Sequence, residues 1–293
     1  MFFLLGVLGL FIFAFFLIPK GYPIHEILHL PIYWWKVSSI PLGDLRQEKI
    51  RYGANATQYY LEFPAEEEEG KAPQIFIYFH GGAWRYGRPE MFKLVASTLV
   101  KLGYTVILPS CRRTPGHNYD AIREDLTALL LAVDQRYSRS APSYILGGMS
   151  SGGNLAAHLF YDRAVLKQQG FDSNRLKALL LLGAPLDLGK MTQNRLVTSF
   201  AGKKDSTLFK QANVQNHLGK SEERPVLLIH GQSDGLVPFA SAHSFIMALQ
   251  KRQGSGIKVY SQVESTHLDV AAWACGENEF KSTILAWLQT EVI

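Results

Sequence analysis

The chain has 293 residues, of which 47% are hydrophobic and 19% are charged, and it carries a formal net charge of +5. This length and apolar content suffice for the core of one large domain, and the basic residues form neither a stripe nor a recognisable nucleic-acid-binding module, so we expect no nucleic acid partner. Two cysteines are too few for a disulfide framework or a metal site, and we expect no metal and no cofactor.

The N-terminus begins with an apolar run. Residues Phe2 to Ile18 are uncharged and nearly all apolar, and Lys20 follows shortly after. As a helix, this run would span about 26 Å, near the lower limit for crossing a bilayer. It lacks the basic start and the small-residue cleavage site that are usual in a secretory signal. We therefore expect residues 1–20 to form an apolar helix that anchors the protein to one side of a membrane; a cleaved secretory signal and a buried helix are the alternatives.

Aromatic side chains mark the next segment, residues 21–45. Tyr22, Tyr33, Trp34 and Trp35 lie among several aliphatic residues. Such residues are typical of a belt at the interface between membrane and water. The segment is predicted either to form this belt or to pack as part of a cap on the domain that follows.

From residue 46 to the C-terminus, strand-like and helix-like runs alternate. Short apolar runs bounded by turn residues predict strands, and longer runs with apolar residues at helical spacing predict helices. The predicted strands cover Gln47–Arg51, Gln58–Phe63, Ile75–Phe79, Tyr104–Pro109, Tyr144–Met149, Leu179–Leu182, Val226–Ile229 and Lys258–Val263. The predicted helices cover Glu90–Leu102, Ala121–Tyr137, Leu155–Gln168, Ser241–Arg252 and Glu279–Leu288. This alternation predicts one α/β domain over residues 46–293, with a mostly parallel sheet covered by helices on both faces.

A glycine-rich loop follows the predicted strand that ends at Phe79. Residues His80–Trp84 read H-G-G-A-W. Consecutive glycines let backbone N–H groups turn toward one point, and the N–H groups of Gly82 and Ala83 are predicted to bind an oxyanion. An ordinary loop after a strand is the alternative.

A serine between two glycines follows the predicted strand that ends at Met149. Gly148 to Gly152 reads G-M-S-S-G, and a helix-like run comes directly after it. A sharp turn from strand to helix leaves the middle residue in a strained backbone with its hydroxyl exposed. Ser150 is therefore the predicted nucleophile, and the N–H of Ser151 is the third predicted oxyanion donor. Because a G-x-S-x-G pattern also arises by chance, a bystander serine in a glycine-rich turn is the alternative.

A long connection spans residues 184–224. One structureless loop of this length is implausible in a compact domain, so the segment is predicted to form a small helical cap over the site. Asp187, near its start, is a possible acid of the site. Four side chains of the segment are predicted either to line a pocket or to pack in the core of the cap: Thr198, Phe200, Leu208 and Phe209.

An acid and a histidine follow the last two predicted strands. Asp234 lies on a tight turn after Ile229, and His267 lies in the loop after Val263. An acid can orient an imidazole and stabilise its charged form, and a histidine in this place can act as a general base. Asp234 and His267 are therefore predicted to act with Ser150. A turn residue that caps the next helix is the alternative for Asp234.

These motifs resemble those of the α/β-hydrolases of esterase and lipase type. Residues 148–156 resemble the nucleophile motif of the branch that includes hormone-sensitive-lipase-like proteins and carboxylesterases, and H-G-G-A-W resembles its oxyanion loop. The run Cys111–Pro115 also resembles a segment of that branch, and we expect Arg112 to organise its loop through a carboxylate such as Asp125. The turn at Asp234 is more similar to the acid loop of dienelactone hydrolases and prolyl oligopeptidases.

The chain departs from the motifs of that branch at three positions. Met149 stands where a polar residue is usual, Ala83 stands where glycine is usual, and Cys111 stands where tyrosine is common. Alanine still offers its N–H, so the predicted oxyanion donors are kept. Trp84 and Met149 are the predicted contacts with substrate.

The resemblance implies the α/β-hydrolase fold with a small helical cap, and the apolar run Phe2–Ile18 adds an apolar N-terminal helix. The resemblance implies a serine hydrolase that cleaves small acyl esters through an acyl-enzyme intermediate, and the N-terminal run predicts that this hydrolase is membrane-associated and acts on lipophilic esters among others. Two alternatives remain: a hydrolase of amides or peptides, similar to formamidases or prolyl oligopeptidases, and a non-catalytic binding protein with the same fold.

Overall fold

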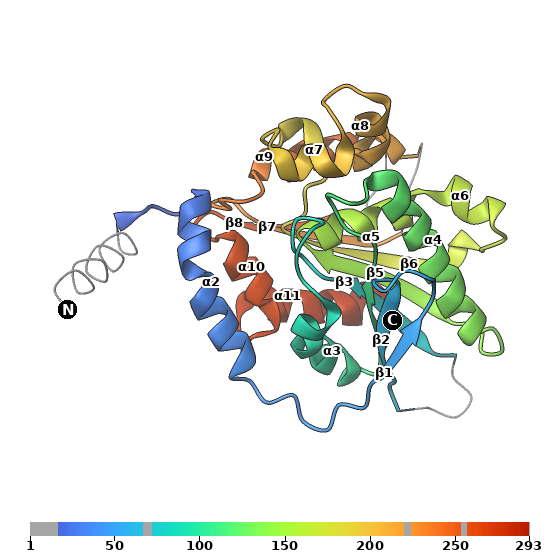
Figure 1. The fold of residues 1–293 in the computed structure, drawn as a ribbon. Helices are drawn as coiled ribbons and strands as arrows, with labels where there is room; N and C mark the ends of the chain where they lie inside the picture. The colour runs from blue at the N-terminus through green and yellow to red at the C-terminus, as the bar shows by residue number, and fades with distance from the viewer. Residues whose placement is uncertain (1–16, 67–71, 220–223, 253–256, 293) are drawn as a thin grey trace.

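A single β-sheet forms the centre of the computed structural model, which describes residues 17–66, 72–219, 224–252 and 257–292. Within these residues the sheet has eight strands in the order β1-β2-β4-β3-β5-β6-β7-β8 (Figure 1). The pairs β1–β2 and β2–β4 are antiparallel, and the other pairs are parallel. The prediction of a mostly parallel sheet is confirmed.

Each strand overlaps a predicted one. The strands are β1 Glu48–Arg51, β2 Tyr59–Phe63, β3 Gln74–Phe79, β4 Thr105–Ser110, β5 Ser143–Met149, β6 Leu176–Leu182, β7 Val226–Gly231 and β8 Ile257–Gln262. The start of β6 differs from the predicted one because Lys177, an exposed polar residue near its beginning, interrupts the apolar run by which the strand was recognised.

The register of the central strands brings the loops of the predicted site together. Phe79 in β3 lies opposite Gly148 in β5. Met149 in β5 lies opposite Leu182 in β6, which is also paired with Ile229 in β7. The carboxyl ends of four parallel strands therefore lie side by side, at the edge where α/β proteins bind ligands.

Helices cover both faces of the sheet, as predicted. The helices of the main domain are α3 Lys93–Val100, α4 Tyr119–Arg136, α5 Ser151–Tyr161, α6 Arg163–Gln168, α9 Phe239–Gln250, α10 His267–Ala271 and α11 Glu279–Trp287. Ile75 and Ile77 of β3 belong to one hydrophobic cluster with α4, α5 and α9, whereas Phe76 and Tyr78 belong to a second cluster with α3, α10 and α11. Successive side chains of a strand point to opposite faces, so β3 is buried on both sides.

The helix predicted over Leu155–Gln168 is two helices, and this prediction was wrong in two respects. The first helix, α5, begins at Ser151, directly after the turn from β5. The chain then leaves the helical conformation at Asp162, where φ is −81° and ψ is 51°. Nε of Arg123 lies 2.6 Å from the Asp162 carboxylate. The apolar spacing continues across this break, so the sequence pattern alone does not reveal it.

Residues 184–224 include short helices, as predicted for the cap. The helices α7 Arg195–Ala201 and α8 Thr207–Ala212 lie near α9 at one end of the molecule (Figure 1). Phe200 and Phe209 are buried in the same cluster as α4 and α5, which favours core packing over pocket lining for these two side chains. The ring of Phe200 stacks on Trp84 with 4.3 Å between centroids, and this contact attaches the insertion to the loop after β3.

The helix α2, Pro23–Ser38, packs beside α10 (Figure 1). Trp34 and Val37 pack against the second hydrophobic cluster, so one face of α2 belongs to the body of the protein. Among the described residues, no helix combines the length and the apolar character that a membrane span needs. The predicted apolar helix of residues 1–20 falls largely outside the described residues, which begin at residue 17.

Candidate active site

Ser150 occupies the turn between β5 and α5. Its backbone has φ 56° and ψ −128°, a conformation that costs a non-glycine residue about 1–3 kcal/mol. A Cβ atom at Gly152 would lie 2.2 Å from the carbonyl oxygen of Phe79 and 2.4 Å from that of His80. A Cβ atom at Gly148 would lie 2.5 Å from the carbonyl carbon of Gly152. Both glycines are therefore required for the close packing that supports this turn.

The loop after β3 turns back on itself beside Ser150. Gly82, Ala83 and Trp84 all have positive φ, at 131°, 52° and 57°. A Cβ atom at Gly82 would lie 2.1 Å from a backbone oxygen of the same loop, so this turn depends on glycine. A Cβ atom at Gly81 would lie 3.3 Å from Cβ of Ser150, which places the loop directly against the serine.

The predicted oxyanion donors come from two segments that meet at Ser150. Among the described residues, the N–H groups of Gly82 and Ala83 donate to no backbone oxygen, and both can bind an oxygen of a ligand. Ser151 is the first residue of α5, and the first N–H groups of a helix have no acceptor within it. The role of these three N–H groups as oxyanion donors stays a prediction.

Asp234 lies in the turn after β7 and is buried. Its Oδ1 accepts hydrogen bonds from the N–H groups of Leu236 at 2.8 Å and Val237 at 2.7 Å, and its Oδ2 lies 2.6 Å from Nδ1 of His267. Burial raises the pKa of Asp234, but His267 and the hydrogen bonds outweigh it and lower the pKa overall. The alternative that Asp234 caps the next helix is wrong, because α9 begins at Phe239 without a side-chain cap.

His267 is the first residue of α10, whose start is fixed by reciprocal hydrogen bonds between Thr266 and Asp269. Burial lowers the pKa of His267, but the charge and hydrogen bond of Asp234, with a smaller contribution from the charge of Glu26, raise it overall. Other buried or partly buried histidines of the described chain have a lowered pKa, chiefly through burial: His25, His80, His158 and His230. A nearby carboxylate favours the charged form of an imidazole, so the raised pKa of His267 reflects its pairing with Asp234.

Ser150 and His267 both lie close to the segment Leu182–Gly183 at the end of β6. The N–H of Ser150 donates to the carbonyl oxygen of Leu182 at 2.7 Å. A Cβ atom at the next residue, Gly183, would lie 3.2 Å from Nδ1 of His267. Within the described residues no hydrogen bond joins Oγ of Ser150 to His267, whose Nδ1 is bound to Asp234. Such bonds are often long without a substrate and shorten when it binds.

Asp187, the other possible acid, is bound elsewhere. Its Oδ1 accepts a hydrogen bond from Nδ2 of Asn213 at 3.2 Å, and its Oδ2 accepts one from Oγ of Ser244 at 2.7 Å. These contacts organise the start of the insertion. His267 is paired with Asp234, so the alternative of Asp187 as its partner is wrong.

The two predicted substrate contacts, Trp84 and Met149, are mostly buried, with 7% and 3% of their surface exposed. Nε1 of Trp84 donates to Oδ1 of Asn154 at 3.1 Å, and its ring stacks on Phe200. Cε of Met149 would lie 3.2 Å from a Cβ atom at Gly183. Both side chains therefore have packing roles, and only their small exposed parts are available to a substrate.

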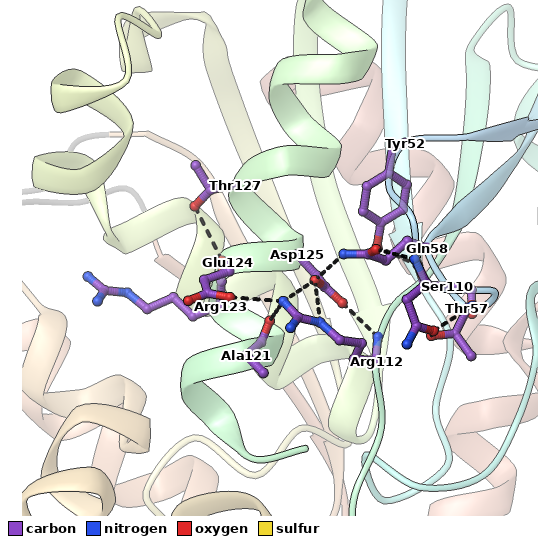
Figure 2. A network of polar contacts seen from close by, with 11 residues as sticks. Tyr52, Thr57, Gln58, Ser110, Arg112, Ala121, Arg123, Glu124, Asp125 and Thr127 are labelled. Atoms are coloured by element: carbon purple, nitrogen blue, oxygen red, sulfur yellow. Dashed lines mark hydrogen bonds and ion pairs between the residues drawn. The ribbon is translucent and has the colours of Figure 1, made fainter. Parts of the chain in front are cut away.

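Asp125 and Arg112 form the predicted pair (Figure 2). Nε of Arg112 donates to Oδ1 of Asp125 at 2.9 Å, and the backbone N–H of Arg112 donates to Oδ2 at 2.7 Å. Nε2 of Gln58 also donates to Oδ1, at 2.7 Å. The prediction that Arg112 organises its loop through Asp125 is confirmed, and the pair ties the loop after β4 to α4.

A small cavity lies beside the predicted oxyanion loop. It is lined by Phe79, His80, Trp84, Tyr86, Pro109, Cys111, Arg113, Ser151 and Leu155. Arg113 brings a guanidinium to this lining, and its Nη2 donates to Oγ of Ser110 at 3.0 Å. In the part of the chain that the structure describes, no group of three or more His, Cys, Asp or Glu side chains is placed to hold a metal ion.

Glu26 reaches the site from α2, although it was not among the residues predicted to form the site. Its side chain is buried and accepts hydrogen bonds from backbone N–H groups of the loops that carry Asp234 and His267. A signal was present in the sequence, because Glu26 is the acidic residue of the otherwise mostly apolar segment Pro23–Ser38. Such a residue is seldom buried unless its charge is bound.

Comparison with protein families gives two matches. The family model described as alpha/beta hydrolase fold matches residues 76–231, a range that contains the loop after β3 and Ser150. The model of the prolyl oligopeptidase family matches residues 187–292, a range that contains Asp234 and His267. The segment with the predicted nucleophile thus resembles one family and the segment with the predicted acid and base resembles the other, as their motifs do.

Solved structures with a similar fold include several esterases. Esterase B from Lactobacillus rhamnosis has a TM-score of 0.72 and 17% identity, with 91% of each chain covered. The hyperthermophilic esterase from the archaeon Pyrobaculum calidifontis has a TM-score of 0.68 and 19% identity, with 89% of each chain covered. At these identities the likeness shows a shared fold.

A curated relative in Danio rerio matches part of the chain. It is the kynurenine formamidase of that fish, 27% identical over 133 residues. The match covers 41% of this chain and 43% of the formamidase, so it spans less than half of either protein.

Proposed function

Because this chain belongs to the α/β-hydrolase fold family, we propose that it is a serine hydrolase that cleaves carboxylic esters. The observation that carries the proposal is the buried pair of His267 and Asp234, 2.6 Å apart, at the sheet edge where the strained turn holds Ser150. The family contains many activities, so the substrate class rests on the site and on the esterases among the similar folds.

In the proposed reaction, Oγ of Ser150 attacks the carbonyl carbon of the ester while His267 accepts the hydroxyl proton. Asp234 holds His267 in the required tautomer and stabilises its charged form. The carbonyl oxygen becomes an oxyanion, which the N–H groups of Gly82, Ala83 and Ser151 bind. His267 then gives its proton to the departing alcohol, and an acyl-enzyme remains on Ser150.

Water completes the proposed reaction. His267 accepts a proton from the water molecule, whose oxygen attacks the acyl carbon. The bond to Oγ breaks, the proton returns to Ser150, and the carboxylic acid leaves. Each step uses side chains and backbone groups of this chain.

Hydrolysis of an amide is a second candidate, and the partial match to a kynurenine formamidase favours it. The same residues would attack the amide carbonyl, and His267 would protonate a departing amine. An amine is a poorer leaving group than an alcohol, so the two candidates differ in how much the site must stabilise the leaving group.

The test is hydrolysis of p-nitrophenyl esters of short to long acyl chains, beside an N-formyl arylamine, by the full chain in detergent. Ser150→Ala should lower kcat roughly 10⁴-fold or more. Ser138→Ala, which removes the hydroxyl of an exposed serine, is the matched control and should keep the rate. Cleavage of the formamide alone would replace the ester proposal by the amide one. A folded protein that cleaves neither substrate would contradict both proposals.

We also propose that the protein associates with a lipid bilayer through its N-terminal part. Ile24, Ile27, Ile32 and Trp35 of α2 are exposed, the last with 71% of its surface in solvent. Their spacing places them along one side of the helix, and the apolar run Phe2–Ile18 precedes them in the sequence. An apolar helix face of this kind can lie in the lipid interface.

Flotation of the full chain with phospholipid vesicles tests the association. We expect the protein to float with the vesicles, and brominated lipid to quench its fluorescence less in Trp35→Phe than in the wild type. Trp273→Phe is the matched control, because that indole is fully buried in the body. A protein that stays at the bottom of the gradient would contradict the proposal.

A further inference from the structure

Glu26 is a buried carboxylate that the proposed reaction does not use. It lies on α2, and its side chain has only 1% of its surface exposed. Taking a carboxylate out of water is costly unless hydrogen bonds compensate for the lost hydration. The contacts of Glu26 therefore indicate what it does.

The carboxylate of Glu26 binds both loops that carry the predicted acid and base. Its Oε1 accepts hydrogen bonds from the N–H of His267 at 2.8 Å and from the N–H of Gly235 at 3.1 Å. Its Oε2 accepts one from the N–H of Leu268 at 3.2 Å. Gly235 directly follows Asp234, so a single side chain links the backbones on either side of the pair.

These hydrogen bonds complete the start of α10. The first N–H groups of a helix have no acceptor within it. The side chain of Thr266 accepts from the N–H of Asp269 at 3.2 Å, and Glu26 accepts from the two preceding N–H groups, those of His267 and Leu268. Glu26, a residue distant in sequence, thus holds the beginning of α10 and with it His267.

The start of α2 is itself fixed against the same loops. A Cβ atom at Gly235 would lie 2.5 Å from the carbonyl oxygen of Tyr22, so the backbone before α2 packs directly against the backbone of the turn after β7. Nζ of Lys20 donates to the carbonyl oxygen of Glu264 at 2.7 Å, just before the loop of His267. Glu26 therefore acts from a firmly docked element.

We propose that Glu26 is a positioning residue, which holds the His267 loop and the Asp234 turn together so that the imidazole stays aligned between Asp234 and Ser150. This inference rests on the proposed function. It adds a fourth side chain, from outside the main domain, to the machinery of the site.

The charges around His267 support this assignment. Asp234 faces the ring from the turn after β7, and His230 of β7 lies beside that carboxylate, with its Nε2 3.5 Å from Oδ2. Glu26 faces the backbone of His267 from α2. Asp234 contributes most to raising the pKa of His267, and Glu26 contributes in the same direction. On α2 itself, His25 lies near Glu26 and has a lowered pKa, chiefly through burial and the neighbouring His29.

Glu26→Gln tests the proposal in the full chain, because it keeps the shape of the side chain and removes its charge and one acceptor. We expect kcat on a p-nitrophenyl ester to fall roughly 10- to 100-fold with little change in KM, since small displacements of a catalytic group cost this much. The acid limb of the pH profile should move to lower pH, because a negative charge near His267 is lost. Glu26→Asp, which keeps the charge, should restore the position of the acid limb.

Glu264→Gln is the matched control. It removes the same charge from an exposed side chain close to His267 in sequence, and it should leave kcat and the pH profile unchanged. If Glu26 served folding alone, Glu26→Gln would lower the melting temperature and the amount of active protein. It would leave unchanged both kcat per site titrated with a fluorophosphonate and the pH of the acid limb. That result would overturn the proposal.

A second measurement does not depend on activity. The proton on Nδ1 of His267 should give a low-field NMR signal, which His267→Gln would identify by its loss. Glu26→Gln should broaden this signal and move its titration to lower pH, and an unchanged signal would overturn the inference. If the wild type hydrolysed no substrate, the proposed function would fail while this signal would still decide whether Glu26 positions His267.

Discussion

Asp234 divides its two carboxylate oxygens between two tasks. Oδ1 binds the N–H groups of its own turn, and Oδ2 binds His267. The hydrogen bonds to Oδ1 orient the carboxylate, because a carboxylate held at one oxygen cannot rotate away from the imidazole. His230 supports the same turn, since its Nε2 donates to the carbonyl oxygen of Val237 at 2.9 Å.

Asp234→Asn should lower kcat roughly 10⁴-fold, because an amide that donates toward Nδ1 favours the wrong tautomer of His267. Measurement of kcat per titrated site checks this expectation. Asp187→Asn is the matched control: its carboxylate binds Asn213 and Ser244, so kcat per site should stay near the wild-type value. If Asp187→Asn lost activity while Asp234→Asn kept it, Asp187 and not Asp234 would be the acid of the site.

The pKa of His267 predicts how the rate depends on pH. The imidazole must be neutral to accept a proton, and Asp234 raises its pKa above the ordinary value of 6.5. We expect kcat/KM to rise as the pH increases through this raised pKa and then to level off. The pairing should stabilise the fold most between pH 3.8 and pH 6.5, the ordinary pKa values of the two groups, and lose this contribution as the pH rises through the raised pKa of His267 or falls through the lowered pKa of Asp234. A rate that is flat from pH 5 to pH 9 would contradict the role of His267 as the base.

At the scale of elements, the docking of α2 on the turn after β7 connects the N-terminal segment to the site. The contact is made by backbone atoms, since the carbonyl of Tyr22 lies where a side chain at Gly235 would begin. A residue larger than glycine would push the helix and the turn apart. The same displacement would pull Glu26 away from the N–H groups that it binds.

Gly235→Ala should therefore destabilise the protein by about 1–3 kcal/mol, the usual cost of overpacking, and should lower kcat as well. Urea unfolding and ester hydrolysis measure the two effects. Gly116→Ala is the matched control, because the nearest atom to its Cβ position is 3.9 Å away. A stable and fully active Gly235→Ala would show that α2 can shift without consequence for the site.

Across the whole molecule, Asp125 joins parts of the chain that are distant in sequence. It is fully buried on α4, and it accepts hydrogen bonds from Arg112 after β4 and from Gln58 before β2 (Figure 2). Nη2 of Arg112 also donates to the carbonyl oxygen of Ala121 at 2.8 Å. The antiparallel edge of the sheet is thereby attached to the helix layer and to the loop that leads toward the site.

Arg112→Met should lower the free energy of unfolding by about 3–5 kcal/mol, because it leaves the carboxylate of Asp125 buried without its cation. Urea unfolding followed by circular dichroism checks this value. Lys281→Met is the matched control; it removes an ion pair with the exposed Glu277 and should cost about 1 kcal/mol or less. Equal effects of the two substitutions would mean that the buried pair stabilises the domain no more than an exposed ion pair does.

Much of the fold could be predicted because its signals are local. The order of strands and helices follows from runs of apolar residues, and the glycines around Ser150 are needed for close approaches that the motif itself creates. The break at Asp162 and the early start of α5 could not be predicted, because the same apolar spacing suits one long helix or two short ones.

The sequence by itself determined the α/β architecture, the strained serine turn and the loops that bring acid and base to one edge of the sheet, because apolar periodicity and glycine-rich turns act over a few neighbouring residues. Only the tertiary structure decided that Asp234 rather than Asp187 faces His267, that Trp84 and Met149 are mostly buried, and that Glu26 binds the loops of the site. Each of these depends on contacts between residues far apart in the chain. Such contacts are fixed by the packing of whole elements, which no local pattern records.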